Sequence, residues 1–94
     1  MVFTFGIKPQ FEVGKEIANK YKGIINNKEE HIKVINHIVN EFNKINYNPK
    51  GITYSLIKGG NDNIEYLIYL TKDNKTNLNY QDIVNKAFNA LKKQ

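Results

Sequence analysis

Two ionisable residues, Lys8 and Glu65, stand at the ends of predicted strands and are the best candidates in this sequence for chemistry. Lys8 follows the apolar run of residues 2–7, and Glu65 lies near the start of a second apolar run, residues 64–70. A carboxylate beside a positioned lysine holds the ammonium in its charged form. Lysine has an ordinary pKa of about 10.4, so it serves as a base near neutral pH only when burial or nearby cations lower that pKa.

Apolar periodicity predicts the elements that position these residues. Residues 8–27 show no sustained period and are expected to form a long loop, with room for one helical turn around residues 12–20. The run over 64–70 is apolar on both faces, which is typical of an interior strand. The other predicted elements are strands over 2–7 and 52–57, a helix over 28–45 capped by Asn27, and a helix over 80–91 capped by Asn79.

The order of these elements brings the two ionisable residues to one edge of a sheet. The strands over 2–7 and 52–57 flank a helix, and such a unit is expected to be parallel and right-handed. A hairpin around Gly59-Gly60 then reverses the chain, so the last strand is antiparallel. The hairpin, the lysine and the glutamate therefore share the edge where open α/β sheets bind ligands. The alternative is that the two residues form only an ordinary surface ion pair between strand ends. The topology taken alone favours this alternative over a functional site.

Composition indicates a single small domain with a basic surface. The chain has 94 residues, no cysteine and a net charge of +5, which excludes disulfides and thiolate metal sites. No apolar stretch approaches the length of a membrane span, so we expect a cytoplasmic protein that does not enter membranes. All 14 basic residues are lysines, which is compatible with RNA binding, although bidentate phosphate and base contacts usually use arginine.

Other residues that could carry chemistry have simpler interpretations. His31 and His37 are six positions apart, which does not suit a metal site on one helix face, so both are expected to be solvated. Tyr66 and Tyr69 could stack on bases, but on a central strand they are expected to be packing residues. The lysines of residues 8–27 could contact RNA phosphates, and a solvated loop is the alternative.

Two segments resemble a known family. Ile7-Lys8-Pro9-Gln10-Phe11-Glu12-Val13-Gly14-Lys15 is similar to a segment of the TlyA family, haemolysin-named proteins related to the FtsJ-type RNA methyltransferases. Residues 55–70, including Asn63-Ile64-Glu65-Tyr66-Leu67, resemble a second segment of the same family. The start of the helix at Glu29-Glu30-His31 also fits, so the resemblance extends over essentially the whole chain.

The resemblance implies an S-adenosylmethionine-dependent ribosomal RNA 2′-O-methyltransferase with a Lys-Asp-Lys-Glu catalytic set. Lys8 would be the second lysine of that set, which handles the 2′-hydroxyl proton, and Glu65 would be the glutamate that orients it. The implied fold is the C-terminal portion of a Rossmann-like class I methyltransferase: a three-stranded mixed sheet, with an antiparallel strand inserted between a parallel pair, and two helices. Candidate RNA contacts are Lys15, Lys20, Lys22 and Lys58.

Several parts of such an enzyme are missing from residues 1–94. The sequence has no glycine-rich cofactor loop, no catalytic aspartate and no first lysine. We therefore expect a single partial domain that binds no cofactor and is inactive alone, and that can form a homodimer through its exposed sheet edge. A non-catalytic basic RNA-binding or interaction module is the alternative, and a membrane-active haemolysin is a weaker one.

Overall fold

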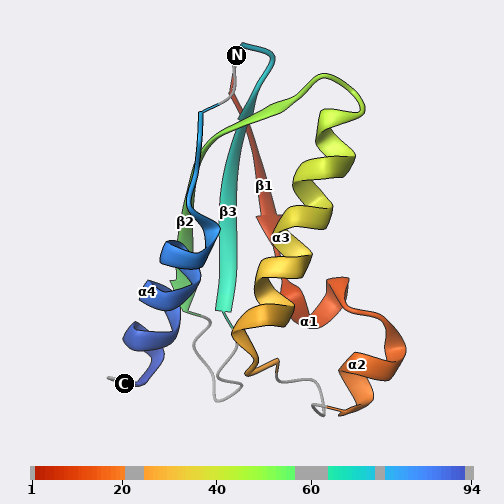
Figure 1. Cartoon of the computed structure of the whole chain (residues 1–94), viewed down its shortest axis with the longest axis vertical. Coiled ribbons are helices and arrows are strands. Elements are labelled where there is room, and N and C mark those ends of the chain that lie inside the picture. The colour runs from red at the N-terminus through yellow and green to blue at the C-terminus, as the bar shows by residue number, and fades with distance from the viewer. Residues whose placement is uncertain (1, 21–24, 57–63, 74–75, 93–94) are drawn as a thin grey trace.

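Three strands and four helices make up the described part of the chain (Figure 1). The structure is a computed structural model that describes residues 2–20, 25–56, 64–73 and 76–92. In chain order the elements are β1 (Phe3–Ile7), α1 (Pro9–Glu12), α2 (Lys15–Lys20), α3 (Lys28–Asn43), β2 (Asn48–Leu56), β3 (Ile64–Thr71) and α4 (Tyr80–Lys92).

The strands form one sheet in the order β1-β3-β2. Strand β3 pairs antiparallel with both neighbours, so β1 and β2 run in the same direction on either side of it. The predicted insertion of the last strand between the first two is confirmed. Every hydrogen-bonded strand pair in the described sheet is antiparallel, however, so the parallel pairing of a Rossmann-like sheet is not confirmed.

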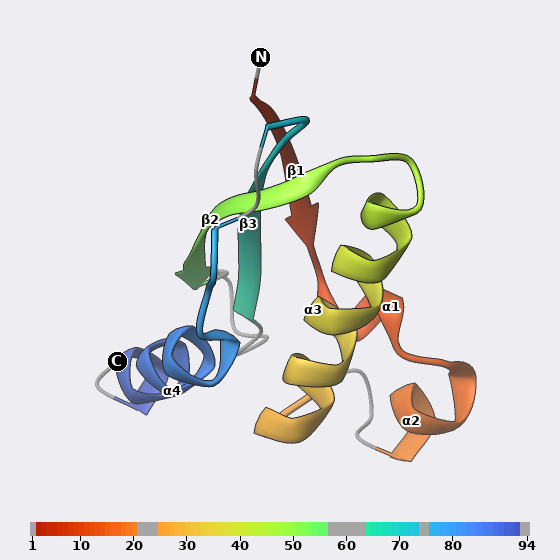
Figure 2. The same cartoon turned by 45° about the horizontal axis from the view of Figure 1, so that its top comes forward.

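Helices α3 and α4 lie side by side over one face of the sheet and form the core with it (Figures 1 and 2). Alternate residues of β3 point into this core because successive side chains of a strand face opposite sides. The buried residues of β3 are Ile64, Tyr66, Ile68 and Leu70, with Thr71 at its end, and Glu65, Leu67 and Tyr69 between them are only partly buried. The prediction of an interior strand is confirmed.

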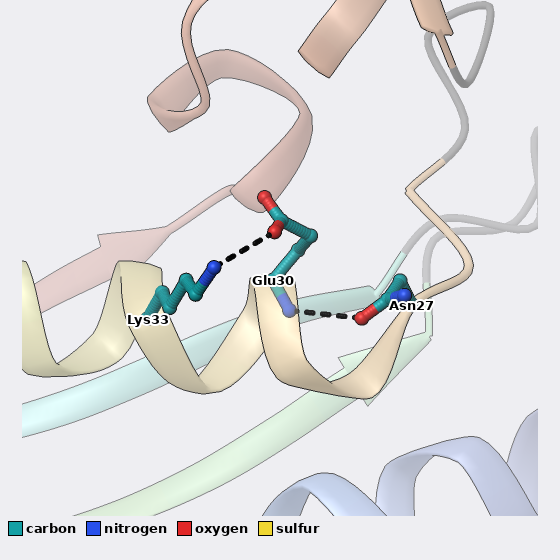
Figure 3. Close-up of polar contacts among 3 residues, drawn as sticks. All are labelled: Asn27, Glu30 and Lys33. Atoms are coloured by element: carbon teal, nitrogen blue, oxygen red, sulfur yellow. Dashed lines mark hydrogen bonds and ion pairs between the residues drawn. The ribbon is translucent and has the colours of Figure 1, made fainter.

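Both long helices begin at the predicted cap residues. The Asn27 side chain accepts a hydrogen bond of 3.1 Å from the backbone N–H of Glu30, and Lys33 forms a 3.5 Å ion pair with the Glu30 carboxylate on the surface (Figure 3). Asn79 accepts a 3.0 Å bond from the N–H of Asp82 at the start of α4. These bonds satisfy backbone donors that have no partner within the helix.

The segment predicted as a long loop contains two short helices. Helix α2 lies where one helical turn was expected, around residues 12–20, but α1 was not expected, and the prediction of only two helices is wrong. Pro9 ends the strand pattern, but it is also the first residue of α1. Proline suits this position because its fixed φ matches the helix and its missing N–H would have no helical partner. The prediction used only the strand-ending property of proline.

Strand β2 begins at Asn48, earlier than the predicted start at residue 52. Asn46 has a positive φ of 66° and makes the turn after α3, after which Pro49 enters the sheet. An edge strand tolerates proline because one side of it has no pairing partner. A register shift between Pro49 and Gly51 marks a bulge there, so residues predicted as a turn belong to the sheet.

Candidate functional site

Lys8 and Glu65 lie at the same end of adjacent strands. Ile7, the last residue of β1, pairs with Tyr66 of β3. Lys8 follows Ile7 and Glu65 precedes Tyr66, so the two residues occupy neighbouring positions at the rim where β1 ends and β3 begins (Figure 1). The predicted topology therefore brings together residues that are far apart in sequence.

The side chains at this rim do not meet directly. Among the described residues no ion pair joins Lys8 to Glu65. The Glu65 carboxylate instead lies across β1, because a Cβ atom added to Gly6 would come within 2.8 Å of its Oε1. The absent side chain of Gly6 leaves the space that this carboxylate occupies. We expected the two side chains to pair directly or through water. The shared rim is confirmed, and the described residues form no direct ion pair there.

The segment after β1 holds the backbone of Lys8 in place. The Lys8 carbonyl accepts hydrogen bonds from the N–H groups of Phe11 (2.9 Å) and Glu12 (3.1 Å). Pro9 is buried, whereas Lys8 is exposed. The Lys8 Nζ lies 6.0 Å from the ring centroid of Phe11, and Phe11 itself is 74% exposed. A fixed backbone therefore carries an exposed lysine and an exposed aromatic ring at the rim.

The structure describes only some of the other lysines proposed to contact RNA. Lys15 begins α2 and Lys20 ends it, and both side chains are exposed. Lys22, Lys58 and the Gly59-Gly60 hairpin lie outside the described residues. A direct contact of Lys15 or Lys20 with RNA remains a prediction.

His31 was expected to be solvated, and this prediction is wrong. Its side chain is 1% exposed, with Nδ1 2.7 Å from the Tyr66 hydroxyl and Nε2 2.7 Å from the Ile25 carbonyl. Burial lowers the pKa of His31 below its ordinary value, although the Ile25 hydrogen bond acts in the opposite direction. Position 31 precedes the buried Ile35 by one helical turn, and this spacing could have predicted its burial. Tyr66 is a packing residue, as predicted.

His37 behaves as predicted. It is exposed on α3, and its Nε2 lies 3.9 Å from a carboxylate oxygen of Glu41. Across residues 2–20, 25–56, 64–73 and 76–92, no three histidine, aspartate or glutamate side chains gather where they could hold a metal ion.

The sequence was compared with known proteins. No protein-family model matches it. Over 64 residues, 68% of this chain, it is 39% identical to a Bacillus subtilis (strain 168) protein named "Putative rRNA methyltransferase YqxC". Two proteins of solved structure share its fold: a "putative hemolysin from Lactococcus lactis" (34% identity, 90% of this chain, TM-score 0.77) and a "putative hemolysin from Streptococcus thermophilus" (31% identity, 98% of this chain, TM-score 0.80).

These matches support the resemblance to haemolysin-named proteins related to ribosomal RNA methyltransferases. The pairing of a methyltransferase name with haemolysin names is what the two sequence segments led us to expect. The chain spans 22% of the Bacillus subtilis protein, and 42% and 34% of the two chains of solved structure. These relatives therefore contain a large part that residues 1–94 do not match. None of the helices in the described residues is both long enough and apolar enough to span a membrane.

Proposed function

We propose that this chain is the C-terminal portion of a cytoplasmic, S-adenosylmethionine-dependent ribosomal RNA 2′-O-methyltransferase, with a Rossmann-like domain completed by a part outside residues 1–94. Lys8 would bind the target ribose hydroxyl and accept its proton, and Glu65 would orient Lys8. The shared rim of these two residues on adjacent strands is the observation that carries the proposal. The name of the Bacillus subtilis relative supports ribosomal RNA as the substrate.

The chemistry of the rim is compatible with these roles. Lys8 is exposed and offers N–H donors to a ribose oxygen. To accept a proton it must lose its own, which requires a covering element or a second cation to disfavour the charged form. Glu65 can reach toward Lys8 by rotating a flexible side chain away from Gly6. The other part of the enzyme would supply both the cover and the substrate position.

Methyl transfer also needs S-adenosylmethionine, and the described residues do not have the features of a binding site for this cofactor. The turn after β1 is Lys8-Pro9, and Pro9 is a residue without an N–H group. Folds of this type hold their cofactor with a glycine-rich turn between a strand and a helix, which is a source of free N–H groups. Residues outside this chain would therefore hold S-adenosylmethionine. We expect calorimetric titration of this chain to give no binding, and micromolar binding would contradict the proposal.

A chimera tests the role of Lys8. In it, this chain replaces the matching segment of the Bacillus subtilis relative, and transfer of radioactive methyl groups to ribosomal RNA is measured. Lys8→Ala should abolish transfer and leave cofactor binding nearly unchanged. Lys44→Ala is the matched control, because Lys44 caps the end of α3 on the opposite side of the molecule from the rim (Figure 1).

The outcomes separate the proposal from its alternative. Transfer retained in the Lys8→Ala chimera would remove Lys8 from the mechanism. A non-catalytic RNA-binding module is the alternative, and the net charge of +5 favours it. In that case the unsubstituted chimera would bind RNA without methylating it. Lys8→Ala would then weaken binding no more than the loss of any other single surface lysine.

A further inference from the structure

Phe11 is the most exposed of the large apolar side chains in the described part of the chain. It is 74% exposed, compared with 58% for Ile45, 50% for Val2 and 45% for Phe3. A solvent-exposed phenylalanine adds little apolar burial to folding, and single exposed apolar side chains are common on protein surfaces. Its position beside Lys8 at the candidate site distinguishes Phe11 from the other three.

Backbone hydrogen bonds fix the turn that carries both Lys8 and Phe11. The N–H of Phe11 donates a 2.9 Å hydrogen bond to the Lys8 carbonyl, and the Val13 N–H donates a 3.1 Å bond to the carbonyl of buried Pro9. The Lys8 Nζ lies 6.0 Å from the ring centroid, at the outer limit of a cation–π contact. The exposed ring and the ammonium group are therefore presented together by one short turn.

We propose that Phe11 is a stacking platform for a nucleobase of single-stranded RNA, while Lys8 contacts the sugar-phosphate of the same nucleotide. Aromatic faces bind bases without regard to sequence, and a neighbouring cation binds the backbone. The positive net charge of the chain favours a polyanion such as RNA over a neutral apolar partner. The role deepens the proposed function, because the stacked base would bring its ribose hydroxyl to Lys8.

The chain offers a direct spectroscopic test because it contains no tryptophan. Phe11→Trp introduces a single fluorophore at the proposed platform. Titration with a short single-stranded RNA should quench its emission, whereas an abasic ribose-phosphate strand of equal length should not. Phe3→Trp is the matched control, since Phe3 begins β1 at the end opposite the rim, and its emission should not respond.

Binding affinity gives a second readout. Phe11→Ala should weaken RNA binding by about tenfold, and Phe11→Trp should bind at least as well as the natural chain. Unchanged affinity of Phe11→Ala, or an RNA that binds without quenching Phe11→Trp, would overturn the proposal. Quenching of Phe11→Trp by self-association of the protein in the absence of RNA would also overturn the proposal. The ring would then contact a second protein molecule.

The chimera distinguishes this inference from the proposed function. If Phe11→Ala raises KM for RNA by about tenfold and leaves kcat within a factor of two, the platform is supported. If the chimera methylates RNA normally with alanine at position 11, stacking is wrong and the proposed function stands. If the tryptophan is quenched by RNA but the unsubstituted chimera transfers no methyl group, the proposed function fails and the platform stands.

Discussion

The Tyr66 hydroxyl lies 2.7 Å from Nδ1 of His31, in the space between α3 and the sheet. Nε2 of His31 is 2.7 Å from the Ile25 carbonyl, which can only accept a hydrogen bond. Nε2 therefore carries the hydrogen, and Nδ1 accepts from the tyrosine. Phe88 of α4 packs edge-on against the imidazole at 4.9 Å between ring centroids. This neutral histidine links the segment before α3 with β3 and α4.

This arrangement predicts that the chain is less stable in mild acid. Burial lowers the pKa of His31 below the value of 6.5 expected in the unfolded chain. Between the two pKa values the unfolded state binds more protons, so stability falls as pH decreases through this interval. The contribution of neutral His31 to stability is fully present above the pKa that this residue has in the unfolded chain. The urea unfolding midpoint should fall as the pH decreases through the unfolded-state pKa of 6.5 toward the lower pKa of the folded chain.

A non-titrating variant isolates the histidine. His31→Gln keeps a donor and an acceptor at this position and should flatten the pH dependence in that interval, at some cost in stability. His37→Gln is the control, because His37 is exposed on the same helix. An equal slope in the natural chain and in His31→Gln would mean that His31 is not buried as a neutral group in solution.

The hydrogen bond of the Tyr66 hydroxyl should contribute more to the free energy of unfolding than a surface hydrogen bond does. Tyr66→Phe leaves Nδ1 of His31 without a donor in a buried site, which should cost about 1–3 kcal/mol in the free energy of unfolding. In His31→Leu the tyrosine hydroxyl and the Ile25 carbonyl lose their partner. The double variant should be less destabilised than the sum of the two single changes, because the second change removes a group that has already lost its partner. Strict additivity would contradict the hydrogen bond.

The sequence predicted the elements with strong periodicity and missed those that depend on one residue with two roles. The apolar stripe of α4 and the two-sided apolar run of β3 locate both elements to within a residue or two. Pro9 was read only as the end of a strand, so α1 was missed. The prediction for His31 considered only its spacing from His37, although its helical position matches the buried stripe.

Some features of the candidate site could likewise be predicted from the sequence, and others could not. Strand directions follow from chain connectivity, so the placement of Lys8 and Glu65 at one rim could be predicted. The insertion of β3 between β1 and β2 was implied only by the family resemblance. The direction of the Glu65 side chain could not, because it depends on the empty space above Gly6 on a neighbouring strand. Sequence periodicity carries no information on that contact. The exposure of Phe11 was also missed, since aromatic residues are more often buried.

We predict that the chain self-associates through β1. The two edge strands of the sheet differ, because β2 contains Pro49, Lys50 and a bulge, all of which discourage pairing. Strand β1 has no charged residue and no proline, and the preceding Val2 is 50% exposed. Such an edge can pair with the same edge of a second copy. Sedimentation equilibrium should show a dimer whose population rises with protein concentration.

Added charge on β1 tests this edge. Val2→Lys with Thr4→Lys should shift the chain toward monomer, since like charges oppose pairing of two copies. The control places the same two charges on α3, by Asn36→Lys with Asn40→Lys at exposed positions. A monomer at high concentration in the natural chain, or equal dissociation in both variants, would exclude the β1 edge as the interface.

Gly6→Ala should move the Glu65 carboxylate without unfolding the chain. The added Cβ would meet Oε1 at 2.8 Å, but this atom ends a flexible side chain that can rotate away. Replacing a strand glycine also reduces the entropy of the unfolded chain, so the free energy of unfolding should change by no more than about 1 kcal/mol. The carboxyl carbon resonance of Glu65 should shift in nuclear magnetic resonance spectra. Gly14→Ala is the control, since nothing lies within 4 Å of its added Cβ. An unchanged Glu65 resonance in Gly6→Ala would mean that the carboxylate does not rest against β1 in solution.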